Sequence, residues 1–137
     1  MPELALGHMQ KRILVSYLLI VLVAEKVIQH TFVSLAFLYD IGGVRSTVAV
    51  DYRALMISGA VIAILFAVAL LALIKKKRWS LYLVALLAAS DIIGEFIAQG
   101  TLIVAINVSI IVAVILLLLC IFGHRIKLYP THDPNQD

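Results

Sequence analysis

The stretch ALMISGAVIAILFAVALLALI, residues Ala54 to Ile74, decides the fold class of this chain. Its twenty-one residues carry no charge, only Ser58 and Gly59 interrupt the apolar run, and the basic residues 75–78 follow it directly. A helix of this length is about 30 Å long, which matches the hydrocarbon core of a bilayer. The stretch is therefore predicted to be a membrane-spanning helix.

The composition of the whole 137-residue chain agrees with this interpretation. Hydrophobic residues make up 64% of the chain and charged residues only 14%, whereas soluble domains have roughly half and a quarter. Apolar blocks of spanning length leave too few polar residues to build a soluble enzyme domain, a nucleic-acid-binding module or a disulfide-linked secreted domain. The sequence thus predicts an all-α integral membrane protein.

No catalytic or ligand-binding motif accompanies the apolar blocks. The sequence contains no phosphate-binding loop, zinc motif, nucleophile elbow or dinucleotide fingerprint. The single cysteine, Cys120, has no second thiol for an intrachain disulfide and is interpreted as a packing residue. We therefore expect no enzymatic activity, no metal and no cofactor.

Two further blocks follow the first one along the chain. Residues 79–99 and 101–122 are each about twenty residues long, which is enough to span a membrane. The second of these blocks is apolar except for Asn107 and Ser109. Because only Gly100 separates the two blocks, they are predicted to be antiparallel neighbours.

The first predicted span, residues 13–38, contains charges at its centre. Its purely apolar part, Ile13 to Ala24, is about 18 Å long as a helix and cannot cross alone. Continuing through Glu25 and Lys26 gives a full span. The alternative is a short interfacial or re-entrant segment that ends at Glu25, but residues 31–38 are too apolar for a solvated loop.

Basic residues are distributed unevenly between the segments that connect these four spans. Only Arg45 and Arg53 lie on one side of the predicted topology. Eight lie on the other side: Lys11, Arg12, Lys75, Lys76, Lys77, Arg78, Arg125 and Lys127. Because basic loops are retained in the cytoplasm, both termini are predicted to be cytoplasmic, in a plasma or inner membrane. The net charge of +3 then reflects topology and indicates no nucleic-acid partner.

The connecting segments are short in this four-helix bundle. They are the cytoplasmic segment 1–12, the outer loop 39–53, the basic cytoplasmic loop 75–78 and the cytoplasmic tail 123–137. The outer loop could be a short strand, an interfacial turn or a linker. Residues 1–8 resemble the scar that an expression vector leaves before a start codon, which would make Met9 the natural first residue.

Polar residues within the predicted spans are the candidate binding residues. An ionisable side chain at bilayer depth costs several kcal/mol and normally faces protein or water. Members four residues apart share one helix face, as Lys26 and His30 do in the first span and Asp91 and Glu95 do in the third. The eight candidates for binding an ion or small solute are Glu25, Lys26, Gln29, His30, Asp91, Glu95, Gln99 and Asn107.

Depth along the spans predicts which of these residues meet. The first and third spans run in the same direction, and Glu25 and Asp91 each lie about 18 Å from the cytoplasmic end. If these two helices pack together, Lys26 lies opposite Asp91 and His30 lies opposite Glu95. Small residues of the third span would permit this close approach; they are Ala88, Ala89, Ser90 and Gly94.

The predicted ladder contains more acid than base. One lysine faces three carboxylates, so a proton, a bound cation or a second subunit would have to balance the excess. An unpaired carboxyl in a membrane tends to hold a proton, as in proton-coupled carriers, and Glu95 is the candidate for this role. The competing interpretation is that these polar pairs only fix the register of the bundle.

Charged and aromatic residues recur at the centres and ends of the spans. They are Glu25, Lys26 and His30 in the first span, Arg78 and Trp79 before the third, and Arg125 and Lys127 after the last. In these features and in length the chain resembles the phosphate-starvation-inducible E family of small four-span membrane proteins. It departs from that family in lacking acidic residues in the second span and in having Ser90-Asp91 where a basic residue is expected. The resemblance implies no defined activity.

Two classes of function remain open for such a protein. The first is a small transporter or an ion- or proton-conducting protein that uses the carboxylates of the first and third spans. The second is a non-catalytic accessory or assembly subunit of a membrane complex, in which the buried charges are structural. Four short helices enclose little interior of their own, so we also expect a homo-oligomer within the lipid bilayer.

Overall fold

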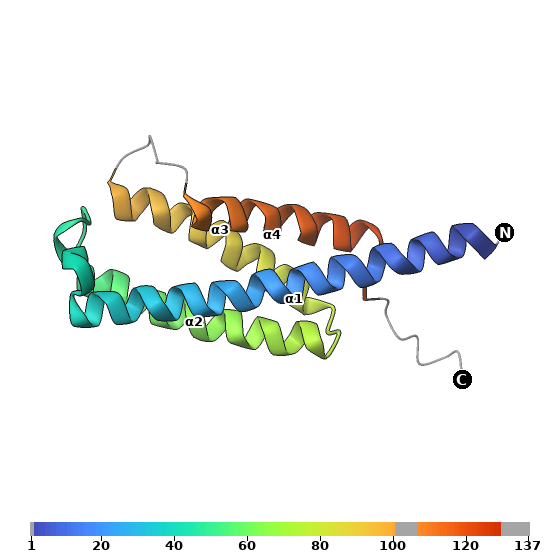
Figure 1. Cartoon of the computed structure of the whole chain (residues 1–137), viewed down its shortest axis with the longest axis horizontal. Helices are drawn as coiled ribbons and strands as arrows, with labels where there is room; N and C mark the ends of the chain where they lie inside the picture. Colours follow the sequence, from blue (N-terminus) through green and yellow to red (C-terminus); the bar gives the residue numbers. More distant parts are fainter. Residues whose placement is uncertain (1, 101–106, 130–137) are drawn as a thin grey trace.

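The computed structural model describes residues 2–100 and 107–129, with side chains from Gly7 onward. Four helices form a bundle, joined at one end by a short 3-10 helix (Figure 1). They are α1 (Pro2–Tyr39), η1 (Ile41–Ser46), α2 (Tyr52–Ile74), α3 (Trp79–Gln99) and α4 (Val108–Arg125). No strand occurs in the described ranges, and the predicted all-α four-helix bundle is confirmed.

Each of the four helices is long and apolar enough to cross a membrane. The bundle is therefore that of a small multi-pass membrane protein. Each helix packs against its two neighbours in the order α1, α2, α3, α4 and back to α1. As a result, α1 and α3 face each other diagonally across the centre of the bundle.

Helix α1 is one continuous helix of 38 residues, Pro2–Tyr39. It passes through Glu25 without a break, which excludes the alternative of a segment that ends there. The helix also begins about three turns before the predicted span, and this part extends beyond the rest of the bundle (Figure 1). Most residues of this extension are strong helix formers, namely leucine, alanine, glutamate, methionine, glutamine, lysine and arginine.

Arg45 of η1 closes the other end of α1. Its Nε donates to the carbonyl of Phe37 (2.8 Å) and its Nη2 to that of Leu38 (2.7 Å). These carbonyls belong to the last turn of α1, where a helix leaves its carbonyl groups without partners. The first part of the outer loop is thus a compact 3-10 turn, and residues 47–51 after it are irregular and form no strand. Gly42 and Gly43 both have positive φ within the turn, a conformation that favours glycine.

Helix α4 begins later than the sequence predicts. Asn107 is its N-cap, with extended backbone, and its Oδ1 accepts from the backbone N–H of Ile110 (3.0 Å). The first six residues of the predicted span, 101–106, lie outside the described residues. Asn107 therefore caps a helix end instead of lying within a span, which agrees with the preference of asparagine for this position.

The core of the bundle differs between its two ends. Toward the basic turn between α2 and α3, it consists of apolar side chains that are completely buried, namely Leu19, Val23, Leu73, Val84 and Leu116. Toward η1, polar residues enter the interior, and Lys26, Asp91 and Ser109 are all buried. The buried charged residues thus lie at one end of the bundle, whereas Ser80, at the start of α3, is a buried polar residue of the other end.

Candidate functional site

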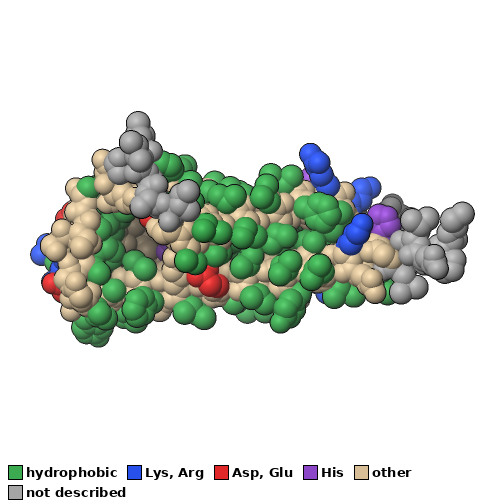
Figure 2. Space-filling model, turned by 45° about the horizontal axis from the view of Figure 1, so that its top comes forward, with side chains coloured by type: hydrophobic (Ala, Val, Ile, Leu, Met, Phe, Trp, Pro, Cys, Tyr) green, Lys and Arg blue, Asp and Glu red, His purple; other side chains and the backbone are tan. Residues whose placement is uncertain are grey.

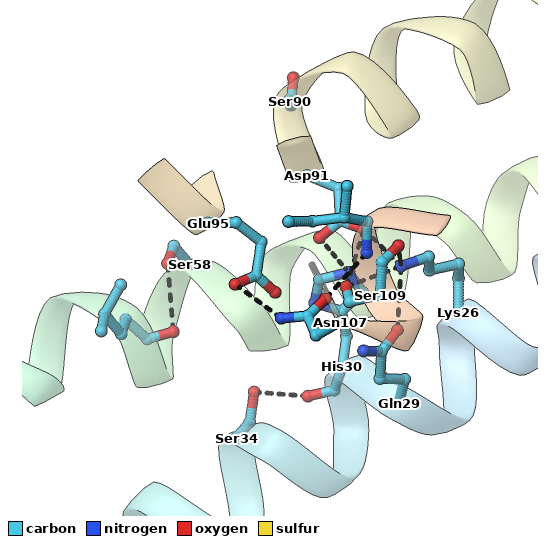
Figure 3. Close-up of polar contacts among 12 residues, drawn as sticks. Lys26, Gln29, His30, Ser34, Ser58, Ser90, Asp91, Glu95, Asn107 and Ser109 are labelled. Carbon is cyan, nitrogen blue, oxygen red and sulfur yellow. Dashed lines mark hydrogen bonds and ion pairs between the residues drawn. The ribbon is translucent and has the colours of Figure 1, made fainter. Parts of the chain in front are cut away.

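Lys26 lies at the centre of the polar region. Its side chain is 0% exposed, and its Nζ donates to Asp91 Oδ2 (2.5 Å), to Gln29 Oε1 (3.0 Å) and to both oxygens of Ser109 (2.9 Å each). The side chain reaches from α1 across the bundle, as Figure 3 shows. An ammonium group has three protons, so these acceptors satisfy it completely.

Asp91 of α3 receives donors from two other helices. Its Oδ2 accepts from Lys26 and from the Ser109 hydroxyl (3.4 Å), while its Oδ1 lies 3.2 Å from His30 Nε2. The His30 contact lacks the geometry of a directed hydrogen bond. The Asp91 side chain is only 7% exposed. A carboxylate this deeply buried depends on its cationic partners.

The predicted pairing of His30 with Glu95 is wrong. His30 points toward Asp91 (Figure 3). Its ring stacks on that of Phe66 of α2, with 5.6 Å between centroids. The reason is the diagonal arrangement of α1 and α3. Only long side chains directed at the bundle centre meet across it, and Lys26 and His30 both meet Asp91.

Among the small residues of α3, Ala88 is completely buried in the core, but Ser90 and Gly94 do not serve the predicted close approach. Ser90 is exposed and bonds to its own helix at Leu86, and a Cβ at Gly94 would meet nothing within 4 Å. The close contact involves α2 instead. A Cβ at Gly59 would lie 2.8 Å from Ser34 Oγ of α1, so glycine there permits these two helices to pack tightly.

Glu95 interacts with the end of its own helix and with the start of α4. Its Oε2 accepts from Gln99 Nε2 and from Asn107 Nδ2, at 3.3 Å each. Both donors are neutral amides. Asn107 therefore makes two contacts at once: its side-chain oxygen caps α4, and its side-chain nitrogen donates to Glu95.

Glu25 does not belong to this cluster. It lies on another face of α1, in a shallow groove lined by Ile20, Val21, Ala24, Ile28 and Gln29. In the part of the chain that the structure describes, its Oε2 is buried without a hydrogen-bond partner. Adjacent helical residues are about 100° apart, so only one of Glu25 and Lys26 can face the centre, and that residue is Lys26.

A cavity lies beside the polar cluster at the η1 end. Its volume is about 330 Å³, and its walls come from α1, α2, α3 and the turn at Thr47. The ionisable residues that line it are His30, Asp91 and Glu95, and Gln99 is among its uncharged polar residues. Figure 2 shows a hollow at this end of the molecule. Lys26 does not line the cavity, so its ammonium is sealed behind Asp91.

The charges at the cavity do not balance. Asp91 and Glu95 supply two carboxylates, whereas Lys26 is the one lysine in contact with either of them among the described residues. His30 can supply a second positive charge only when it is protonated. The site can therefore hold a proton or a small cation.

Two residues of the cluster were not predicted as site residues. Ser109 binds Lys26 through both oxygens, and Phe66 stacks on His30. Ser109 was recognised only as a polar residue in an apolar block, and a lone serine carries no stronger signal. Phe66 was indistinguishable from the other apolar residues of its helix.

The described residues contain no group of three His, Cys, Asp or Glu side chains placed to hold a metal ion. The phosphate-starvation-inducible E resemblance stays a prediction. No protein-family model matches the chain, and neither the curated proteins nor the solved structures yield a match.

Proposed function

We propose that the protein is a small carrier for protons or for a small cation, which bind at the carboxylates of the cavity. The observation that carries this proposal is a cavity of about 330 Å³ bordered by His30, Asp91 and Glu95, with one negative charge in excess of the lysine that pairs with them. Intramembrane acids that border a cavity are typical of ion and proton pathways.

The packed half of the bundle favours a carrier over an open pore. Between Lys26 and the basic end, the interior is filled by completely buried side chains, namely Leu19, Val23, Leu73 and Leu116. A permeating ion would need this half to rearrange. Alternating exposure of one binding site to the two sides is the mechanism that fits such a closed half.

The side of the membrane from which the cavity is accessible follows from the basic residues. Lys75 to Arg78 form the turn between α2 and α3, at the end opposite η1. If this end is cytoplasmic, as the positive-inside rule predicts, the cavity faces the outside. A proton or cation would then enter past Thr47 and reach Glu95 and His30 before Asp91.

Within the site, the groups have different parts in this proposal. Among the described residues, the partners of Glu95 are neutral amides, so it can accept a proton without losing a cationic partner there. His30 Nε2 lies 3.2 Å from Asp91 Oδ1, so a proton taken up by His30 would place a second positive charge beside this carboxylate. A cation that reaches Asp91 competes with Lys26, and its binding is thereby coupled to the central ion pair.

Reconstituted vesicles test this proposal. A pH or cation gradient across vesicles that contain the protein should collapse faster than across empty vesicles, and Glu95→Gln should abolish the difference. Glu25→Gln is the matched control, because it neutralises a carboxylate at similar depth outside the cavity. Folded protein that moves neither protons nor cations would contradict the proposal.

The second candidate is a non-catalytic accessory subunit of a membrane complex. The observation that favours it is the complete satisfaction of the Lys26 ammonium, which is what a structural ion pair requires. In this case Glu95→Gln and Asp91→Asn would change only thermal stability. The protein would also copurify with a larger membrane complex.

A further inference from the structure

Helix α1 has a second long face, which points away from the bundle. Its residues are spaced alternately four and three apart: Leu14, Leu18, Val21, Glu25, Ile28, Phe32, Leu35 and Tyr39. We call this set the α1 seam. Its seven apolar members are between 38% and 71% exposed. A repeat of this kind is the pattern of left-handed coiled coils, including pairs of membrane helices.

The bundle itself uses a different face of α1. Leu19, Val23 and Lys26 are 0% exposed and point into the core. Because residues on the seam are exposed along the same length of helix, the seam cannot be part of the bundle packing. It is free to contact lipid or another protein.

Contact with lipid would account for the apolar residues of the seam but not for the carboxyl group of Glu25. It lies in the middle of the seam, and its groove is lined by apolar residues apart from Gln29. Its Oε2 has no hydrogen-bond partner among the described residues. A carboxyl group in hydrocarbon costs several kcal/mol unless something satisfies it.

We propose that the α1 seam binds a second copy of the chain, in a parallel dimer in which the two Glu25 carboxyl groups hydrogen-bond to each other. Copies inserted with the same topology run parallel, and a two-fold axis along the membrane normal places equal residues opposite each other. Glu25 of one copy then meets Glu25 of the other. The seam keeps its spacing from Leu14 to Tyr39, so both helices match along their whole length.

The chemistry of a carboxyl group favours a second copy over a different partner. A carboxylic acid that holds its proton is both a donor and an acceptor, and it can therefore satisfy an identical group. A different membrane helix would have to bring a hydrogen-bonding side chain to the same depth, whereas a second copy brings Glu25 there by symmetry.

Cysteine crosslinking tests the location of the interface. The background is Cys120→Ala, which removes the single native thiol. Val21→Cys and Ile28→Cys on the seam should crosslink between copies in membranes. Ile64→Cys is the matched control, since Ile64 is 64% exposed near the middle of α2. Equal crosslinking at Ile64, or none at the seam, would overturn the proposal.

A second experiment tests the role of Glu25. Energy transfer between labelled copies in vesicles, measured over a range of protein-to-lipid ratios, gives the association constant. Glu25→Leu should lower it roughly five- to thirtyfold, the effect of one interhelical hydrogen bond in a membrane. Glu25→Gln should retain association to within about twofold, because an amide also donates to and accepts from its own copy.

The outcomes also separate this inference from the proposed carrier function. Glu25 bonds to no described residue of its own chain, so Glu25→Leu should leave the thermal stability of the monomer unchanged. If a monomeric Glu25→Leu variant still transports, both the proposed carrier function and the dimer proposal stand. Unchanged association in Glu25→Leu, or loss in both variants, would overturn the dimer proposal.

Discussion

The two ends of the bundle interior are built differently. Toward the basic turn between α2 and α3, Leu19, Leu73 and Leu116 fill the core without exposure. Toward η1, His30, Asp91 and Glu95 border a cavity of about 330 Å³. Lys26 marks the boundary, since it is as buried as the leucines and yet bonds only to polar atoms. The comparison indicates that the packed end provides stability, whereas the hollow end holds the groups on which the proposed function depends.

Removing Lys26 should have the largest effect on stability. Lys26→Met leaves Asp91 buried with only His30 to compensate it, and loss of one partner of a buried pair costs about 3–5 kcal/mol. Lys11→Met, at an exposed position of the same helix, is the control. Thermal unfolding in detergent measures both. If Lys26→Met unfolds at the same temperature as Lys11→Met, the Lys26–Asp91 ion pair does not stabilise the bundle.

A cavity in the packed end should have the next largest effect. Leu116 is completely buried and Leu118, on the same helix, is 61% exposed. Leu116→Ala should cost about 2–5 kcal/mol, because a buried leucine leaves a void behind it, whereas Leu118→Ala should cost little. The same unfolding assay compares them. Equal effects would mean that the packed end is not closely packed.

Asn107 tests the link between α4 and the hollow end. Asn107→Ala removes the N-cap of α4 and one donor to Glu95, and a lost cap costs about 0.5–2 kcal/mol. Asn107→Asp keeps the cap but removes the donor. The aspartate variant should therefore regain stability while its transport rate stays altered. If the two variants have the same stability and the same transport rate, the N-cap of α4 does not contribute to stability as proposed.

The smallest expected change is a stabilisation. Gly94 lies in the interior of α3 beside the cavity, and a Cβ there would meet nothing within 4 Å. Gly94→Ala should raise stability by about 0.5–1 kcal/mol, because glycine is a poor helix former. Gly100→Ala is the contrasting variant, since Gly100 has a φ of 64° and a Cβ there would lie 2.6 Å from Ala49 Cβ. A loss of stability in Gly94→Ala would show that the hollow end is tighter than the structure indicates.

The fold could be predicted because its physical causes act along the chain. Block length and hydropathy define the four helices, and counting depth along parallel spans places Lys26 opposite Asp91. These quantities depend on sequence position alone. The exception is the start of α4, where apolar residues continue upstream of Asn107 and composition marks no boundary.

The details of the site depend on rotation and packing order, which the sequence does not determine. Glu25 and Lys26 are both ionisable and adjacent, and nothing in the sequence tells which one faces the centre. The diagonal placement of α1 and α3 likewise decides that His30 meets Asp91 and that Glu95 meets Asn107. A prediction based on depth alone cannot distinguish helices that are neighbours from helices that lie diagonally across the bundle.

The most direct test of the account is whether water reaches the hollow end and not the packed end. Single cysteines at Ser58, which lines the cavity, and at Leu116, in the packed core, can be placed in the Cys120→Ala background. A membrane-impermeant maleimide should label Ser58→Cys only from the side that carries η1 and should not label Leu116→Cys. Labelling of Ser58→Cys from the basic side, or from neither side, would contradict the account.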